Sequence, residues 1–228
     1  MKKYLSDQPQ YIVHFSFCQD AGARQCRGTS IGRGKAKRER ALVRYHSRHR
    51  VNSDVGGHIV EVFEAIRTIL AVRSYQDKPV PSEVLHRIVE AGRLTASAMN
   101  SQPWHFILVQ DRAMLRQLGS LARTGPYVAS AAAAVVVVVE KGMFGLSDGS
   151  RAIQSMLLAA WSDGVGSNWV GFSGGLENVK PVLGIPAELD VLGILPFGYP
   201  EKSIGRGKKN RKPVADVAHG ERFGQPLT

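Results

Sequence analysis

The sequence Asn100-Ser101-Gln102-Pro103-Trp104 leads, through His105, into the apolar run Phe106-Ile107-Leu108-Val109. Pro103 fixes its own φ angle and restrains the residue before it, while the apolar run predicts a buried strand. Together they predict a polar loop entering a sheet. Such a junction displays amide and backbone hydrogen-bonding groups at a sheet edge, which suits a flat polar heterocycle. A well-capped structural loop is the alternative interpretation, and the surrounding sequence decides between them.

Helical and strand patterns alternate on both sides of this junction. Apolar spacing predicts a first helix that begins at Val62, a second from an N-cap at Ser82, a third over 112–121, a fourth from an N-cap at Asp148, and a short one near 176–182. Apolar and β-branched runs predict strands over 106–110, 135–139, 167–172 and 190–195. The alternation predicts an α/β or α+β sandwich built on one central sheet.

The positive charge is concentrated in the first quarter of the chain. Residues 1–60 hold 12 of the 30 Lys and Arg residues and 4 of the 19 Asp and Glu residues, so their net charge is +8, and residues 61–228 carry the remaining +3. Gly, Arg, Lys, Ser and His dominate residues 28–50, without a sustained apolar period. We therefore expect residues 1–60 to be a basic, disordered extension and residues 61–228 to be the folded domain.

Several function classes find little support. A basic segment could contact phosphates, but no aromatic residues interleave with it, so nucleic-acid binding is not favoured. The sequence has no glycine-rich nucleotide fingerprint, no G-x-S-x-G elbow and no paired metal-ligand spacing. The longest apolar stretch, residues 128–139, is too short to cross a membrane. With both cysteines in residues 1–60, we expect a cytoplasmic protein with no membrane partner, whose chemistry is carried by a cofactor.

Four ordered segments between about Glu61 and Gly224 make the chain similar to the nitroreductase family of FMN-dependent flavoproteins. They are Glu64–Tyr75, Leu94–Trp104, Asp148–Phe172, and Leu195–Pro200 with Lys209–Pro213. The resemblance implies an α+β fold, a three-layer α/β/α sandwich with a central mixed, largely antiparallel sheet. It also implies a homodimer with flavin sites at the interface.

The resemblance also implies roles for seven residues. Arg73, Lys209 and Arg211 would bind the FMN phosphate, and cationic side chains suit that group. Ser97 and Asn100 would meet the ribityl chain or the ring edge from the partner subunit. The backbone at Val170 and Gly171 would offer an N–H group near the flavin N5 atom. No side chain is assigned a catalytic role, and no metal is expected.

One departure from the family lies in the expected phosphate site. The family usually shows Arg-X-Ser where this chain has Ile69-Leu70-Ala71. A charge-assisted hydrogen bond contributes about 1.5–3 kcal/mol, so the loss of a guanidinium and a hydroxyl weakens the expected FMN binding.

The resemblance therefore supports two functional hypotheses. The first is an oxidoreductase with tightly bound FMN, in which NADH or NADPH and then a nitro, quinone or similar electron-poor acceptor react in a ping-pong cycle. The second is a non-catalytic flavin-binding or sequestering protein on the same fold, prompted by Ile69-Leu70-Ala71.

Overall fold

A four-stranded antiparallel sheet lies at the centre of the computed structural model, which describes residues 61–171, 175–202 and 209–227. The strand order is β1-β2-β4-β3, with β1 at Trp104–Val109, β2 at Ala133–Glu140, β3 at Gly166–Ser167 and β4 at Leu189–Gly198. A parallel bridge joins Ala71 to Ser167 and adds the segment after the first helix to this edge. The sheet is thus mixed and largely antiparallel, as predicted.

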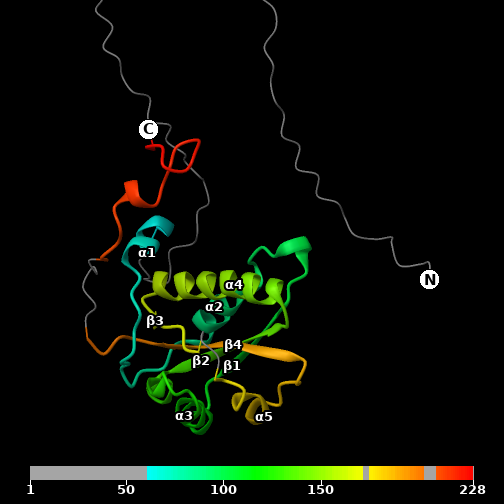
Figure 1. Cartoon of the computed structure of the whole chain (residues 1–228). Coiled ribbons are helices and arrows are strands. Elements are labelled where there is room, and N and C mark those ends of the chain that lie inside the picture. The colour runs from blue at the N-terminus through cyan, green and yellow to red at the C-terminus, as the bar shows by residue number, and fades with distance from the viewer. Residues whose placement is uncertain (1–60, 172–174, 203–208, 228) are drawn as a thin grey trace, which may run out of the picture. The chain divides into compact units, whose positions relative to one another are not determined.

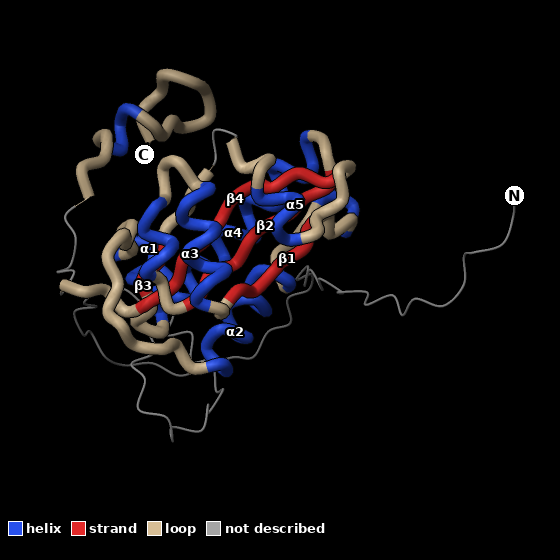
Figure 2. Tube along the Cα trace, turned by 90° about the horizontal axis from the view of Figure 1, so that it is seen from below, coloured by secondary structure: helices blue, strands red, loops and turns tan. Residues whose placement is uncertain are grey.

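Helices cover both faces of the sheet. The described residues form α1 (Val62–Thr68), α2 (Ser82–Arg93), α3 (Arg112–Leu121), α4 (Met143–Ser162) and α5 (Val179–Leu183). Short 3₁₀ segments lie at Ala98–Asn100, Pro126–Ser130 and Val214–Asp216. Helices α2 and α4 lie on one face, and α3 and α5 on the other (Figures 1 and 2). The predicted α+β fold with three layers is confirmed.

Strand β2 contributes side chains to two hydrophobic clusters, one on each face of the sheet. Alternate residues of a strand point to opposite faces, so its seven buried residues divide between two hydrophobic clusters. Residues 135, 137 and 139 pack with side chains of α2 and α4, including Leu85, Ile88, Ile153 and Met156. Residues 134, 136 and 138 pack with side chains of α3 and α5, including Leu115, Leu118 and Val179. One continuous apolar run therefore requires a helical layer on each side.

Helix α4 begins before its predicted start, so the prediction of Asp148 as its N-cap is wrong. The N-cap residue is Gly142, whose φ of 116° reverses the chain after β2 in a conformation that favours glycine. Met143, Phe144 and Leu146 are exposed and form no buried stripe. The apolar spacing that predicts a helix is therefore missing from the first turn of α4. Asp148 instead lies inside the helix and is fully buried.

The buried Asp148 carboxylate connects α4 to the polar loop before β1. One oxygen accepts a hydrogen bond of 2.9 Å from the backbone N–H of Ala98, the first residue of a 3₁₀ turn. The other oxygen pairs with Arg151, one turn further along α4. Asp148 therefore caps the loop rather than its own helix, and it fixes Ser97 and Asn100 at this end of α4.

Two further boundaries differ from the predictions. Ser82 is the first residue of α2 and not its cap, since Pro81 precedes the helix in extended conformation and no side chain caps it. The predicted strand over 167–172 is interrupted, because Ser167 ends β3 and pairing resumes only at Val170 opposite Ile194. Between them, the Trp169 indole packs over Gly193 and donates to the Leu192 carbonyl. The predicted extension, residues 1–60, lies outside the described residues.

Replacement of Asp148 tests the connection between α4 and the loop. Asp148→Ala should lower the free energy of unfolding by about 1–3 kcal/mol, because the partly buried Ala98 N–H loses its acceptor. Asp148→Asn keeps an acceptor oxygen and should lose less. Arg93→Ala is the control, since the Arg93–Glu90 pair on α2 is exposed on both sides and should contribute at most about 1 kcal/mol. Equal losses for the Ala and Asn variants in denaturant titrations would contradict the capping role.

Candidate functional site

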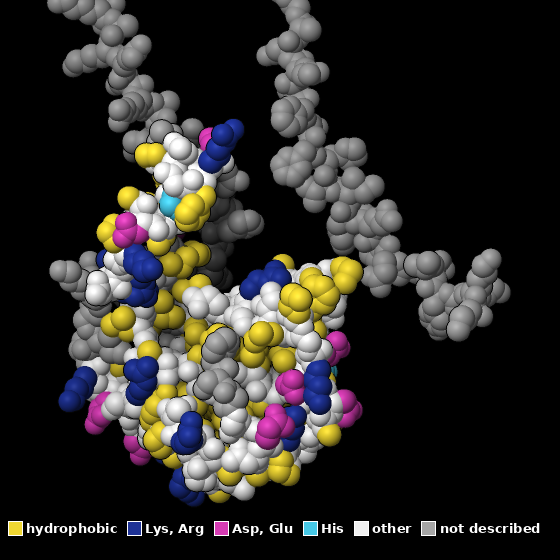
Figure 3. Space-filling view, in the orientation of Figure 1, with side chains coloured by type: hydrophobic (Ala, Val, Ile, Leu, Met, Phe, Trp, Pro, Cys, Tyr) yellow, Lys and Arg dark blue, Asp and Glu magenta, His cyan; other side chains and the backbone are white. Residues whose placement is uncertain are grey.

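A cavity of about 780 Å³ lies beside the end of α1. Its walls come from α1 and the segment after it, from α4, from residues 167–169 and from the C-terminal segment. In the view of Figure 3, hydrophobic side chains gather between the body of the domain and the C-terminal segment, with Lys and Arg side chains near them. The described lining residues are Ile66, Arg67, Ile69, Leu70, Ala71, Gln154, Leu157, Ser167, Asn168, Trp169, Lys209 and Arg211.

One wall of this cavity is apolar. Ile69, Leu70 and Ala71 follow α1 directly and all three line the cavity, together with Ile66 from the last turn of that helix. The departure noted in the sequence therefore faces this cavity. The C-terminus of a helix carries a partial negative charge, so the end of α1 adds no attraction for an anion.

Three cationic side chains are found among the described lining residues. The Arg67 guanidinium donates two hydrogen bonds, of 2.8 and 2.6 Å, to the Glu64 carboxylate, which raises its pKa and offsets its charge. Lys209 donates a hydrogen bond of 2.5 Å from Nζ to the Ile66 carbonyl. Desolvation and the neighbouring Arg211 lower the pKa of Lys209. Lys209 and Arg211 are two positions apart in the C-terminal segment, so both positive charges lie at this cavity.

Other residues of the lining supply polar groups and one aromatic ring. Gln154 and Leu157 project from α4 one turn apart, Ser167 ends β3, and Asn168 and Trp169 follow in the irregular segment after it. The buried Ser167 hydroxyl has no hydrogen-bond partner within the described part of the chain. Asn168 donates from its amide to the Tyr127 hydroxyl. These residues offer hydrogen-bonding groups and a flat apolar surface to a ligand.

Of the seven predicted site residues, Lys209 and Arg211 are the two that line the cavity of about 780 Å³. Arg73 lines a smaller neighbouring cavity of about 210 Å³, next to Ser74, Glu201 and Lys202. Gly171, with a φ of 95°, lines a different cavity of about 430 Å³.

The backbone N–H of Val170 is already used within the sheet. It donates to the Ile194 carbonyl at 3.0 Å, and Val170 is buried. Among the pair predicted to offer an N–H group near the flavin, Gly171 is therefore the candidate donor.

The loop that carries Ser97 and Asn100 is strained and held from within. Met99, Asn100 and Gln102 have φ angles of 51°, 55° and 49°, a left-handed conformation that is uncommon outside glycine. The Ser97 hydroxyl accepts the Gln102 N–H at 3.0 Å, and Asp148 holds Ala98. Strain of this kind persists where the surroundings over-determine the backbone, often at functional sites. Ser97 and Asn100 do not line the large cavity of their own chain.

The sequence interpretation did not single out Gln154, Leu157, Ser167, Asn168 and Trp169 as site residues. A signal was present for one pair, since Gln154 and Leu157 have the i, i+3 spacing that puts two side chains on one helix face. The irregular backbone at 168–169 has no comparable signal.

The cavity is large enough for a flavin mononucleotide, and its lining outside the apolar wall at Ile69, Leu70 and Ala71 suits that group. Ligand sites commonly measure about 300–1,000 Å³ and combine apolar walls with few polar groups. Trp169 and Leu157 would contact the ring, the amides of Gln154 and Asn168 could bond its polar edge, and Lys209 with Arg211 would face a phosphate. The described residues hold no cluster of metal-ligating side chains, and none of their helices has the length and apolarity to cross a bilayer.

Comparisons with known proteins agree on one family. The sequence model of the Nitroreductase family matches residues 67–147 and 143–199. A protein of Archaeoglobus fulgidus, provisionally named NADH dehydrogenase/NAD(P)H nitroreductase, is 35% identical over 172 residues, covering 72% of this chain and 99% of the relative. The FMN reductase [NAD(P)H] of Bacillus subtilis is 26% identical over 187 residues, covering 72% of this chain and 74% of the relative.

A solved structure agrees with these relatives. The FMN-dependent nitroreductase of Clostridium difficile R20291 superposes with a TM-score of 0.62 at 25% identity, covering 71% of this chain and 99% of that structure. The family sequence match spans more than half of the chain, and the A. fulgidus protein is covered along nearly its whole length. The chain therefore belongs to the nitroreductase family.

Proposed function

We propose that the chain is an FMN-dependent oxidoreductase that takes electrons from NADH or NADPH. The observation that carries this proposal is the cavity of about 780 Å³, which Trp169 and Leu157 line with apolar side chains and Lys209 and Arg211 with positive charge. The family membership and the names of relatives, an FMN reductase and an NADPH-flavin oxidoreductase among them, support it.

Bound FMN would supply the redox chemistry, so the protein's task is to bind and orient. Trp169 and Leu157 would pack on the ring, while Gln154 and Asn168 would fix its orientation through their amides. The described lining residues include no carboxylate, histidine or cysteine, and His86 and His105 are exposed elsewhere. A reaction that depends on stacking geometry suits such a site better than acid–base chemistry does.

The acceptor class follows from the same surroundings. A cavity with apolar and aromatic walls favours a flat, electron-poor molecule such as a nitro compound or a quinone. Because the reductant and the acceptor would use the same open face of the ring, we propose that they bind in alternation, in a ping-pong cycle. We also propose a cytoplasmic location, where NAD(P)H is available. Residues 61–228 contain no cysteine that an oxidising compartment would pair. Cell fractionation would test this location.

We further propose a homodimer with a flavin site at each end of the interface. Ser97 and Asn100 lie near Asp148, whereas the cavity is lined by Gln154 and Leu157 further along α4. Leu157 is nine positions after Asp148 in the helix, a rise of about 14 Å. A second copy could bring its own loop to this cavity, which explains why the loop is strained and yet apart from the cavity of its own chain.

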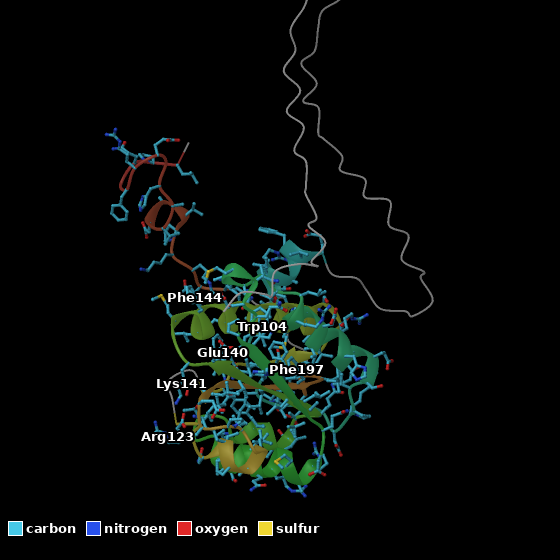
Figure 4. The ribbon with its side chains drawn as sticks, turned by 90° about the vertical axis from the view of Figure 1, so that its right-hand side faces the viewer. Trp104, Arg123, Glu140, Lys141, Phe144 and Phe197 are labelled. Atoms are coloured by element: carbon cyan, nitrogen blue, oxygen red, sulfur yellow. The ribbon has the colours of Figure 1, made fainter. Side chains whose placement is uncertain are left out.

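An exposed apolar patch beside the loop supports this dimer. Leu94, Met99, Met143, Phe144 and Leu146 are all large and exposed, with Met99 85% and Met143 80% accessible. Figure 4 shows Phe144 at the end of α4 that follows Glu140 and Lys141. Met143, Phe144 and Leu146 lie at the start of α4, and Met99 follows Ala98, which is bonded to Asp148 of the same helix, so we propose that they form one interface.

The second candidate function, a flavin-sequestering protein, is favoured by Ile69-Leu70-Ala71. An apolar wall at the expected phosphate position could support binding without efficient turnover. Reduction of the bound flavin separates this candidate from the oxidoreductase.

Flavin absorbance before and after anaerobic addition of NADH or NADPH tests the main proposal. We expect the purified protein to show the bands of oxidised flavin, or to acquire them with added FMN, and the reductant to bleach them. Protein that neither carries nor acquires flavin would refute both candidates, and flavin that is bound but never bleached would favour sequestration. If residues 61–228 form the domain, as we propose, deletion of residues 1–60 should leave the bands and their bleaching unchanged.

Acidic substitutions in the exposed patch test the dimer. Phe144→Asp combined with Leu146→Asp should weaken self-association at least about tenfold, because two charges would be buried without partners. Sedimentation velocity over a range of protein concentrations would report the change. Ala113→Asp, on the exposed face of α3 across the sheet, is the control and should associate like the unmodified protein. A double variant that associates as strongly as this control would refute the proposed interface.

A further inference from the structure

The cavity of about 780 Å³ has one wall without side-chain hydrogen-bond donors for a phosphate, whereas other lining residues carry positive charge. Ile69, Leu70 and Ala71 bring no side-chain donor to their wall. The neighbouring backbone belongs to the C-terminal end of α1, and a helix C-terminus disfavours negative charge. Phosphate groups are usually bound at the opposite pole, a helix N-terminus, where free N–H groups point at the ligand. This wall therefore has the wrong polarity for a phosphate.

The cationic side chains compensate only in part. The charge of Arg67 is offset by its two hydrogen bonds to Glu64. Lys209 is already bonded to the Ile66 carbonyl, so a phosphate would have to compete with that carbonyl for its ammonium group. Arg211 is exposed, and water screens its attraction for an anion. Two partly committed or solvated cations add only a few-fold affinity each.

The remainder of a flavin finds better partners in the same cavity. The aromatic ring of Trp169 and the side chain of Leu157 offer apolar contact area, and Gln154 and Asn168 carry amides. Ser167, whose buried hydroxyl has no partner among the described residues, lines the cavity as well. Affinity for a flavin should therefore come mainly from the ring and the ribityl chain.

We propose that this cavity binds unphosphorylated flavin, riboflavin, with an affinity within about thirtyfold of that for FMN, and that Lys209 and Arg211 together account for the preference for the phosphate. The proposal rests on the proposed function, because it assumes that a flavin occupies the cavity. It extends the ligands of the site from a phosphorylated flavin to flavins in general.

Binding titrations of the full, flavin-free chain with FMN and with riboflavin test the proposal, with quenching of flavin fluorescence as the signal. We expect the two dissociation constants to differ by less than about thirtyfold. Lys209→Ala combined with Arg211→Ala should weaken FMN to the level of riboflavin and leave riboflavin unchanged. Arg116→Ala, an exposed cation on α3 across the sheet, is the matched control and should change neither.

A gain of affinity gives a second, independent measurement. Ile69→Arg combined with Ala71→Ser places a guanidinium and a hydroxyl on the apolar wall. FMN binding should tighten at least about tenfold while riboflavin binding stays the same. The outcome does not depend on loss of function, so a poorly folded variant cannot imitate it.

The outcomes separate the two proposals. If neither flavin binds, the proposed function fails, and this inference with it. If FMN binds more than about thirtyfold more tightly than riboflavin, the function stands and the inference is overturned. The inference is also overturned if the Ile69→Arg and Ala71→Ser pair leaves FMN affinity unchanged, because a wall that already satisfies the phosphate gains nothing from new donors.

Discussion

The rest of the domain depends on the burial of β2 on both faces. A strand whose alternate side chains are all apolar cannot leave either face in water, so each face needs a helical layer. Helix α4 belongs to one of these layers and runs 20 residues across it. Because α4 spans the sheet, it holds the loop at Asp148 and forms a cavity wall at Gln154 and Leu157. The central strand thus positions the helix that carries both parts of the site.

The fold was predictable where a local signal and tertiary burial agree. Helix α3 has the predicted bounds because the Asp111 carboxylate caps its start at the Met114 N–H and Leu115 and Leu118 face the core. The start of α4 was mistaken because Asp148 is a strong cap former by residue type, while its buried bond to Ala98 joins residues 50 positions apart. Propensity carries no information about such a partner.

The site was less predictable than the fold. Its clearest sequence feature, Ile69-Leu70-Ala71, does line the cavity together with Lys209 and Arg211. These segments are joined by the hydrogen bond from Lys209 to Ile66, two residues that are 143 positions apart. The periodicity of the sequence cannot predict a contact over such a separation. Resemblance to a family suggested that Lys209 and Arg211 belong to the site. The roles of Arg73, Ser97, Asn100 and Gly171 remain predictions, because the walls that they would form involve other cavities or a second chain.

The attachment of α1 links this site to local folding. This seven-residue helix leaves Val62 and Phe63 exposed and is joined to α4 by a 2.9 Å hydrogen bond from the Trp161 indole to the Thr68 hydroxyl. A helix so short is marginal by itself, so its amides should exchange with solvent long before those of β2. Since Lys209 bonds the Ile66 carbonyl at its last turn, an anion that draws this ammonium away would also promote fraying of α1. Ligand occupancy and the order of α1 are then thermodynamically coupled, even though the central sheet stays unchanged.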